Sequence, residues 1–491
     1  MINLPKAFSE YMIRLLGQDA YERLENGLTD EPQVSVRLNR KKLADAGFCL
    51  NQEKSVAMAD VPWCRFGFYL TERPSFTFDP LFHAGAYYVQ EAGSMFLEQA
   101  FAACMRVMEA DNTPLMALDL CAAPGGKSTH LRSLLPEGSF LVSNEPVRSR
   151  AQILVENMQK WGDPACMVTN GYPADFSPLV HLFDLIVADV PCSGEGMFRK
   201  DEGAITEWSP ENVVTCWQRQ RTIISEVWPA LKPGGCLIYS TCTFNQYEDE
   251  ENVAWIAKEL GADVVEIPVA EEWQIMGDLT GKGLPVYHFL PGWTRGEGFF
   301  LAVLRKKESL EEESLSRWES VASRKSGKKN KTEKKNSKNR NSDSIRCSAV
   351  PDKWLSGDDW EWFQDGGRMY ACPSEFSDVC TAVKTCLPVL YYGIPVAEQK
   401  GHDWIPMHAL ALNRAFNSDV FPKVTLDYQQ AIAYLRKESL VLPEETPKGY
   451  VLLTYRGFSL GFAKQIGNRA NNLYPDTWRI RSGYVTRCEL F

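Results

Sequence analysis

The sequence predicts an α/β protein built on a doubly wound parallel sheet. Five short apolar runs between about residues 96 and 305 are typical of buried strands, at 115–120, 140–143, 166–169, 185–188 and 236–240. Candidate helices begin between or after them, near Gly126, Val147, Pro210 and Gln246. A turn of small residues, 121–126, joins the first strand to the first helix. In such sheets ligands bind beyond the carboxyl ends of the strands, so we expect the functional residues there.

The segments on either side of this core predict further units. The first 95 residues combine a helical opening, Phe8–Asn26, with strand-like pieces such as Val34–Asn39, which indicates a small α+β unit. Gly298–Leu304 fits an additional edge strand, and Gly449–Phe462 fits a hairpin with glycine turns. We therefore expect units at 1–95, 96–305, 306–352, 353–425 and 426–491.

Composition limits the class of protein. A chain of 491 residues is too long for one core, and it contains no apolar run of the roughly 18 residues that a membrane span needs. The amino terminus lacks the basic start and apolar stretch of a secretory signal, so we expect a cytoplasmic protein. The 14 cysteines are scattered singly, which predicts reduced thiols and no metal site. A net charge of −10 disfavours a protein that is basic throughout, but it leaves room for a local basic path.

The segment 306–352 predicts a disordered, charged linker. Between Arg324 and Arg346 it carries ten Lys or Arg residues against Glu333 and Asp343, with almost nothing apolar to bury. Such a run could follow a phosphate backbone. A solvated tether is the favoured interpretation, because like-charge runs usually have that role.

The turn after the first strand resembles a phosphate-binding loop, but it departs from that motif. Cys121 stands where the motif needs its first glycine, and Pro124 removes a backbone N–H from the cradle. Nucleotide triphosphate hydrolysis is therefore the less favoured use. A turn that passes under an adenosine-type cofactor fits better, with Asp119 just before it and Lys127 just after; a purely structural turn is the remaining alternative.

Polar residues end the next two strands. Glu145 follows the second strand, where a carboxylate can accept both hydroxyls of a ribose, and Arg150 is spaced to orient it. After the third strand an acidic residue would suit an adenine amine, but the sequence has Asn170.

Two cysteines follow the last two predicted strands, Cys192 after Asp189-Val190-Pro191 and Cys242 within Ser240-Thr241-Cys242-Thr243. Either one alone would be interpreted as a buried core thiol. As a pair at neighbouring strand ends beside a cofactor turn, they predict covalent chemistry on an electron-poor ring.

These motifs resemble the RNA cytosine-5 methyltransferases of the Sun-domain family, closest to bacterial 16S rRNA enzymes of the RsmF type. The similar segments are 83–94, 121–129, 189–200 and 239–244, with Glu248, Glu250, Glu251 and Asn252 following. The closing segment 449–481 resembles the PUA-like RNA-binding module of RsmF-type members. The resemblance implies a Rossmann-like S-adenosylmethionine-dependent core, preceded by a small α+β domain and followed by an α+β region that ends in a PUA-like β module.

The resemblance also implies a mechanism. Cys242 is the thiolate that adds to carbon 6 of cytosine, and Cys192 assists loss of the carbon 5 proton and product release. Asp189 bonds the Watson–Crick edge of the ring, and Lys127 supports the same charge. The residues implied in binding S-adenosylmethionine are Asp119, Cys121, Ala122, Ala123, Pro124, Gly125, Gly126, Lys127, Glu145, Arg150 and Asp189.

The expected partner is RNA, most simply 16S rRNA of the small ribosomal subunit, bound by a monomer without metal or membrane. Two alternatives stay open: the same chemistry on transfer RNA, and an RNA-binding assembly factor without turnover. Basic residues expected to contact RNA are Arg199, Lys200, Lys464, Arg469, Arg479 and Arg481.

Overall fold

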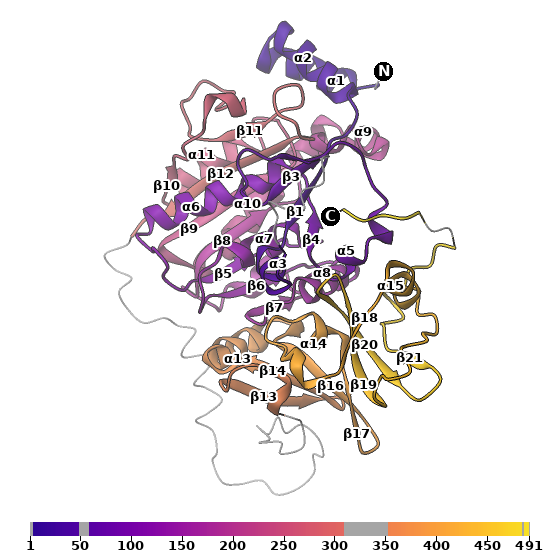
Figure 1. The fold of residues 1–491 in the computed structure, drawn as a ribbon. Helices are drawn as coiled ribbons and strands as arrows, with labels where there is room; N and C mark the ends of the chain where they lie inside the picture. Colours follow the sequence, from indigo (N-terminus) through magenta and orange to yellow (C-terminus); the bar gives the residue numbers. More distant parts are fainter. Residues whose placement is uncertain (1–2, 49–57, 309–351, 484–485, 491) are drawn as a thin grey trace, which may run out of the picture.

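The structure is a computed structural model that describes residues 3–48, 58–308, 352–483 and 486–490. Figure 1 shows a larger body that contains the central sheet, with the orange and yellow C-terminal elements packed below it. The predicted linker at 306–352 falls on residues 309–351, outside the described residues. Every helix in the described ranges is too short or too polar to cross a membrane.

The core is a nine-stranded sheet in the order β10-β12-β9-β8-β5-β6-β7-β15, with β11 also paired to β12. Five of its strands are parallel, and each one contains or overlaps a predicted apolar run. They are β5 (Met116–Asp119), β6 (Phe140–Asn144), β7 (Cys166–Thr169), β8 (Phe183–Asp189) and β9 (Leu231–Thr241). The predicted α/β class is therefore confirmed.

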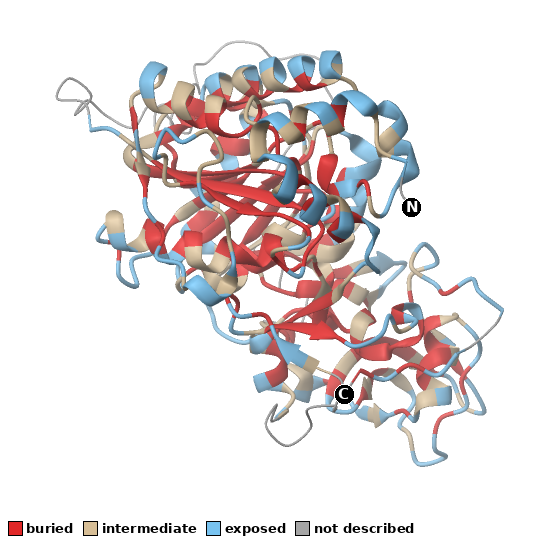
Figure 2. Cartoon of the chain, turned by 90° about the horizontal axis from the view of Figure 1, so that it is seen from above, coloured by how far each residue is buried: buried red, intermediate tan, exposed pale blue. Residues whose placement is uncertain are grey.

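Helices cover both faces of this sheet, and the strand side chains alternate between them. On one face Ala117 and Leu141 pack with side chains of α6, α7 and α8; on the other, Leu118 and Phe140 pack with side chains of α10, α11 and α13. Figure 2 shows the buried sheet lying between these half-exposed helices. Their bounds are α6 (Leu97–Val107), α7 (Gly126–Leu134), α8 (Arg148–Trp161), α10 (Pro210–Val227), α11 (Glu250–Glu259) and α13 (Ser377–Cys386).

The two edges of the sheet differ from the prediction. The strand expected at an edge is β12 (Phe299–Lys306), but it lies inside the sheet, antiparallel to β9 and flanked by β10 (Ala262–Val265) and β11 (Tyr287–Phe289). These flanking strands have four and three residues, too few to show a periodic pattern. At the other edge β15 (Val389–Tyr392), far along the chain, pairs antiparallel with β7.

The N-terminal residues form an antiparallel sheet, in the order β2-β3-β1-β4, and two leading helices. The leading helices pack on the larger body, where the Phe8 ring lies 5.2 Å from Phe198 and 5.5 Å from Trp208. The elements are α1 (Lys6–Leu16), α2 (Gln18–Thr29), β1 (Val34–Leu38), α3 (Arg40–Asp45), β2 (Met58–Asp60), β3 (Gly67–Leu70), α5 (Pro80–His83) and β4 (Tyr87–Val89). A further helix of the larger body, α9, spans Glu202–Glu207.

The C-terminal residues form two four-stranded sheets, β13-β14-β16-β17 and β18-β19-β20-β21. The predicted hairpin is confirmed as β19 and β20, which pair antiparallel. Side chains of α15 and β19 share a core with Val36 and Phe78 of the N-terminal unit, so the two ends of the chain meet. The elements are β13 (Trp360–Asp365), β14 (Arg368–Pro373), β16 (Ile394–Lys400), β17 (Asp403–Pro406), α14 (His408–Leu412), β18 (Lys423–Thr425), α15 (Tyr428–Leu435), β19 (Gly449–Tyr455), β20 (Phe458–Gln465) and β21 (Ala470–Asn472).

Candidate active site

The turn between β5 and α7 provides backbone groups rather than reactive side chains. Gly125 has a φ of +116°, which favours glycine, and a Cβ at this position would lie only 3.2 Å from the Leu154 side chain. Ala122 and Ala123 are buried in the core beneath the sheet edge. Burial raises the pKa of the Cys121 thiol far above its usual range, so this cysteine is a neutral packing group.

Asp119 ends β5 with one carboxylate oxygen lacking a partner. Oδ2 accepts a 2.6 Å hydrogen bond from the Ser128 hydroxyl, whereas buried Oδ1 has no hydrogen-bond partner among the described residues. Burial raises the pKa of this carboxyl to about 7, although Ser128 and Lys127 pull it down. An unpaired buried carboxylate oxygen is costly, which points to a donor from a ligand.

Glu145 lies at the end of β6 and is tied to the turn through Arg150. Its Oε1 accepts from the Val147 amide at 2.9 Å, and its Oε2 lies 3.5 Å from Arg150 Nη1. The same guanidinium donates to the Ala123 carbonyl at 3.0 Å. The structure therefore brings the predicted acid and the predicted orienting arginine together.

Two asparagines fix the loops around Glu145, and the sequence predicted a role for neither of them. Buried Asn144 donates from Nδ2 to the carbonyls of Leu120 and Gly171, and so links the loops after β5 and β7. Asn170 donates to the backbone carbonyls of Glu145 and Pro146 at 2.7 and 2.9 Å. Its amide nitrogen is therefore occupied by the neighbouring loop.

Cys192 and Cys242 face each other across the ends of β8 and β9. Their sulfur atoms lie 3.0 Å apart, and the Cys242 amide lies 3.3 Å from the Cys192 sulfur. The hydrogen bond to Cys242 and then burial raise the pKa of Cys192 well above its usual value. The two sulfurs are therefore joined by a hydrogen bond in which either one can be the donor.

Asp189 and Lys127 form an ion pair at the same edge. Lys127 Nζ lies 2.9 Å from Asp189 Oδ2, and Asp189 Oδ1 accepts from the Ser240 hydroxyl at 2.7 Å. Burial lowers the pKa of Lys127, but Asp189, Asp119 and Cys242 together outweigh it and the pKa is raised overall. The lysine is therefore a fixed positive charge, 4.8 Å from the Phe299 ring centre.

A buried glutamate, Glu248, joins the loop that contains Cys192 to the loop that contains Cys242. It accepts hydrogen bonds from the Ser193 amide at 3.1 Å, Gln220 Nε2 at 2.6 Å and Asn245 Nδ2 at 2.8 Å. Burial raises its pKa to about 7, against the pull of these donors. Its only signal in the sequence was its position six residues after Cys242, within the family resemblance.

A second cluster, outside this edge, has the composition of a metal site. Atoms of Cys64, Glu98 and His130 lie within 4.8 Å of one another, with 3.6 Å between His130 Nε2 and Glu98. Burial raises the pKa of Cys64 to about 12, so the thiol stays protonated. Burial and the positive charge of Arg37 lower the pKa of His130 to about 4. Cys64 Sγ also lies 3.9 Å from His130 Nε2, so the three side chains form one hydrogen-bonded cluster.

The prediction that Arg199 contacts RNA is wrong. Its side chain is only 6% exposed, and Nε lies 2.7 Å from the Glu297 carboxylate. Lys200 is 3.2 Å from the same carboxylate but is 35% exposed. The basic pair thus holds the loop after Cys192 in place, and Arg199 is unavailable to RNA.

The parallel sheet, the small-residue turn and the acidic strand ends define a Rossmann-like methyltransferase. A solved structure described as a methyltransferase homolog protein from Pyrococcus horikoshii agrees with this class. It is 25% identical, with a TM-score of 0.52, and the match covers 62% of this chain and 96% of that one.

Relatives and family models extend over most of the chain. Ribosomal RNA small subunit methyltransferase F of Salmonella agona is 32% identical over 454 residues, 90% of this chain and 89% of the relative. The protein of the same name from Aliivibrio salmonicida is 31% identical over 457 residues, 90% of each. Family models match at 4–92 (N-terminal domain of 16S rRNA methyltransferase RsmF), 105–305 (16S rRNA methyltransferase RsmB/F) and 421–480 (methyltransferase RsmF PUA domain).

The chain belongs to the RsmF family of methyltransferases. The predicted family, the methyltransferase core and the PUA domain are confirmed. S-adenosylmethionine is the methyl donor of this family, which confirms the predicted cofactor.

Proposed function

We propose that this protein methylates carbon 5 of a cytosine in 16S rRNA. The observation that carries the proposal is the 3.0 Å contact between the Cys192 and Cys242 sulfurs, beside the Asp189–Lys127 ion pair. Methylation of a ring nitrogen or a hydroxyl needs no covalent thiol, whereas carbon 5 becomes nucleophilic only after a thiolate adds to carbon 6. The relatives named for the small-subunit rRNA support the class of substrate.

The edge of the sheet fits S-adenosylmethionine. Unpaired Asp119 Oδ1 suits the amino group of the methionine part, and Glu145 suits the ribose hydroxyls. When bound, the cofactor supplies an electrophilic methyl group. The residues that we propose to hold it are Asp119, Cys121, Ala122, Ala123, Pro124, Gly125, Gly126, Lys127, Glu145, Arg150 and Asp189.

Cys242 is the proposed nucleophile. Its sulfur forms a bond to carbon 6, the electrons of the C5=C6 bond shift toward carbon 4, and nitrogen 3 takes up a proton. Asp189 accepts a hydrogen bond from the resulting N–H, and the charge on Lys127 keeps that carboxylate in place.

Cys192 is the proposed base of the second half-reaction. Once carbon 5 carries the methyl group, the electrons left by its proton re-form the C5=C6 bond, the sulfur–carbon bond breaks with its electron pair returning to Cys242, and nitrogen 3 gives up its proton. Once it has given up its own proton, Cys192 is a strong base because its pKa is raised, and its sulfur lies 3.0 Å from that of Cys242.

The proposal is tested by a methyl-transfer assay with tritiated S-adenosylmethionine. Separate reactions contain 16S rRNA, assembled small subunits and transfer RNA, and bisulfite sequencing of the product shows whether carbon 5 of a cytosine is modified. We expect one of the rRNA forms to be methylated. Label at another atom, or on transfer RNA alone, would contradict the proposal.

Substitution of Glu145 by alanine is expected to weaken binding of S-adenosylmethionine by about 1–3 kcal/mol, the usual loss for hydrogen bonds to a charged group. Calorimetry measures the change directly. Glu137→Ala is the matched control, because that carboxylate is 86% exposed. An unchanged dissociation constant for Glu145→Ala would move the ribose contact elsewhere.

Affinity for S-adenosylmethionine is expected to fall as the pH drops below about 7. The pKa of Asp119 is raised to about 7, mainly by burial, so below this pH the carboxyl takes up a proton and loses its charge. The dissociation constant should then rise by up to about tenfold per pH unit, and stay level above pH 7. Titrations at several pH values test this, and Asp119→Asn should bind weakly at every pH. A pH-independent affinity in the natural protein would argue against Asp119 as the charged contact.

A further inference from the structure

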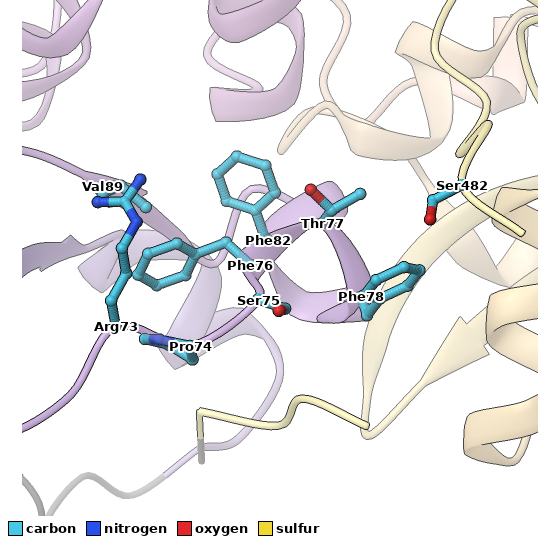
Figure 3. Close-up of a pocket in the computed structure, with 9 residues that line it drawn as sticks. All are labelled: Arg73, Pro74, Ser75, Phe76, Thr77, Phe78, Phe82, Val89 and Ser482. Atoms are coloured by element: carbon cyan, nitrogen blue, oxygen red, sulfur yellow. The ribbon is translucent and has the colours of Figure 1, made fainter. Parts of the chain in front are cut away.

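A cavity lies where the N-terminal unit meets the C-terminal end of the chain, outside the cysteine-bearing edge of the sheet. Its volume is about 640 Å³. Figure 3 shows Arg73 at one end, Phe78 and Ser482 toward the other, and the rings of Phe76 and Phe82 between them. The lining residues are Arg73, Pro74, Ser75, Phe76, Thr77, Phe78, Phe82, Val89 and Ser482.

The lining combines aromatic rings with positive charge. Three of its nine residues are phenylalanines, one is an arginine, and none is acidic, although the whole chain has a net charge of −10. Arg73 and Arg481, which adjoins Ser482, are both exposed. Neither forms an ion pair within the described residues. Their charges are therefore available to an anionic ligand.

Both ends of the chain hold the wall of the cavity in place. The Thr77 carbonyl lies 2.8 Å from His83 Nε2, and the Phe78 carbonyl accepts a 2.9 Å hydrogen bond from the Tyr428 hydroxyl. Buried Asp79 accepts from the Leu81 amide at 2.9 Å. The aromatic segment 76–82 is thus fixed by the C-terminal module as well as by its own turn, and the cavity is formed before any ligand binds.

We propose that this cavity receives one unstacked nucleotide of the RNA strand, with its base against the half-buried ring of Phe82 and its phosphate at Arg73. Unpaired bases are recognised by stacking on aromatic side chains, and guanidinium groups bind phosphate in a bidentate manner. The volume falls in the range of about 300–1,000 Å³ that is usual for small-ligand pockets. The inference rests on the proposed function, since it needs RNA as the substrate, and adds a contact that positions the strand away from the cysteines.

Two variants separate the two halves of the site. Arg73→Gln removes the charge from an exposed side chain, and Ser75→Trp fills the cavity from an exposed position whose hydroxyl caps no helix. Their matched controls are Lys307→Gln, an exposed lysine directly after β12, and Ser374→Trp, an exposed serine outside the cavity. Thermal unfolding of all four confirms that the full chain remains folded.

The readout is fluorescence anisotropy with a labelled single-stranded oligouridylate and a duplex RNA of equal length, at two salt concentrations. Arg73→Gln should weaken binding of the single strand about 3- to 10-fold and make its salt dependence shallower by one phosphate contact. Ser75→Trp should weaken it at least about fivefold with an unchanged salt dependence. Both variants should bind the duplex and S-adenosylmethionine like the natural protein.

The outcomes distinguish this inference from the proposed function. If the natural protein binds the single strand and methylates rRNA but both variants match their controls, the cavity assignment is wrong and the function stands. Equal losses on single-stranded and duplex RNA would also overturn it, since a duplex offers no unstacked base. If the natural protein neither binds nor methylates RNA, both proposals fail. Ultraviolet crosslinking of a 5-bromouridine strand to residues 73–82 gives an independent check.

Discussion

Replacing Cys242 with alanine is expected to abolish methyl transfer to RNA without unfolding the protein. The change removes the only atom that we assign to bond formation with carbon 6, so the rate should fall by on the order of 10⁴-fold or more. Cys242 is half-buried and its side chain lies outside the hydrophobic clusters, so the loss of one thiol should cost less than about 1 kcal/mol of stability. Tritium incorporation and thermal unfolding measure the two quantities.

Cys216→Ala is the matched control for this experiment. That thiol is buried on α10, outside the sulfur pair, and its pKa is raised to about 11 by burial. It should retain full methyl transfer. Activity of the Cys242 variant comparable with that of the natural protein would remove the basis of the covalent mechanism.

The parallel core could be predicted because each of its strands shows a signal within its own short stretch of sequence. A buried parallel strand shows as a continuous apolar run, and the helices after β5 and β6 begin within one residue of their predicted starts, at Gly126 and Arg148. The pairings of β10, β12 and β15 could not be predicted in this way. β15 joins β7 across more than 200 residues of sequence, and a pairing between distant strands leaves no periodic signal in either.

The candidate site shows the same difference between residues with a local sequence signal and residues whose role depends on distant segments. The candidate reactive residues could be proposed from the sequence because they stand in recognisable motifs near strand ends, and the structure brings Cys192 to Cys242 and Lys127 to Asp189. Asn144 was missed because its role depends on three loops meeting, which only the fold creates. Arg199 was wrongly predicted to face RNA, because the sequence does not show that it has a buried ion-pair partner. A charged residue in a sequence is expected at the surface, and its buried partner Glu297 lies 98 residues away.

The last expected result concerns Cys192→Ala, which should accumulate a covalent complex between protein and RNA. The nucleophile Cys242 is retained, so its sulfur can still bond to carbon 6 and the methyl group can still be transferred. Release of the methylated RNA from Cys242 should be slowed, because the variant lacks the sulfur that we propose to take the carbon 5 proton. A denaturing gel should show a slowly migrating species that depends on both RNA and S-adenosylmethionine, while multiple turnover falls at least about 10²-fold.

The double variant Cys192→Ala/Cys242→Ala is the decisive control, because it removes the bond-forming sulfur from the same background. The slow species should then vanish. Its persistence would place the covalent bond on another residue, and its absence from Cys192→Ala itself would contradict the separate roles of the two sulfurs. Reversed behaviour, with the complex trapped by Cys242→Ala, would exchange those roles. That exchange would place the bond to carbon 6 on Cys192, whose pKa is raised by the hydrogen bond to Cys242 and by burial.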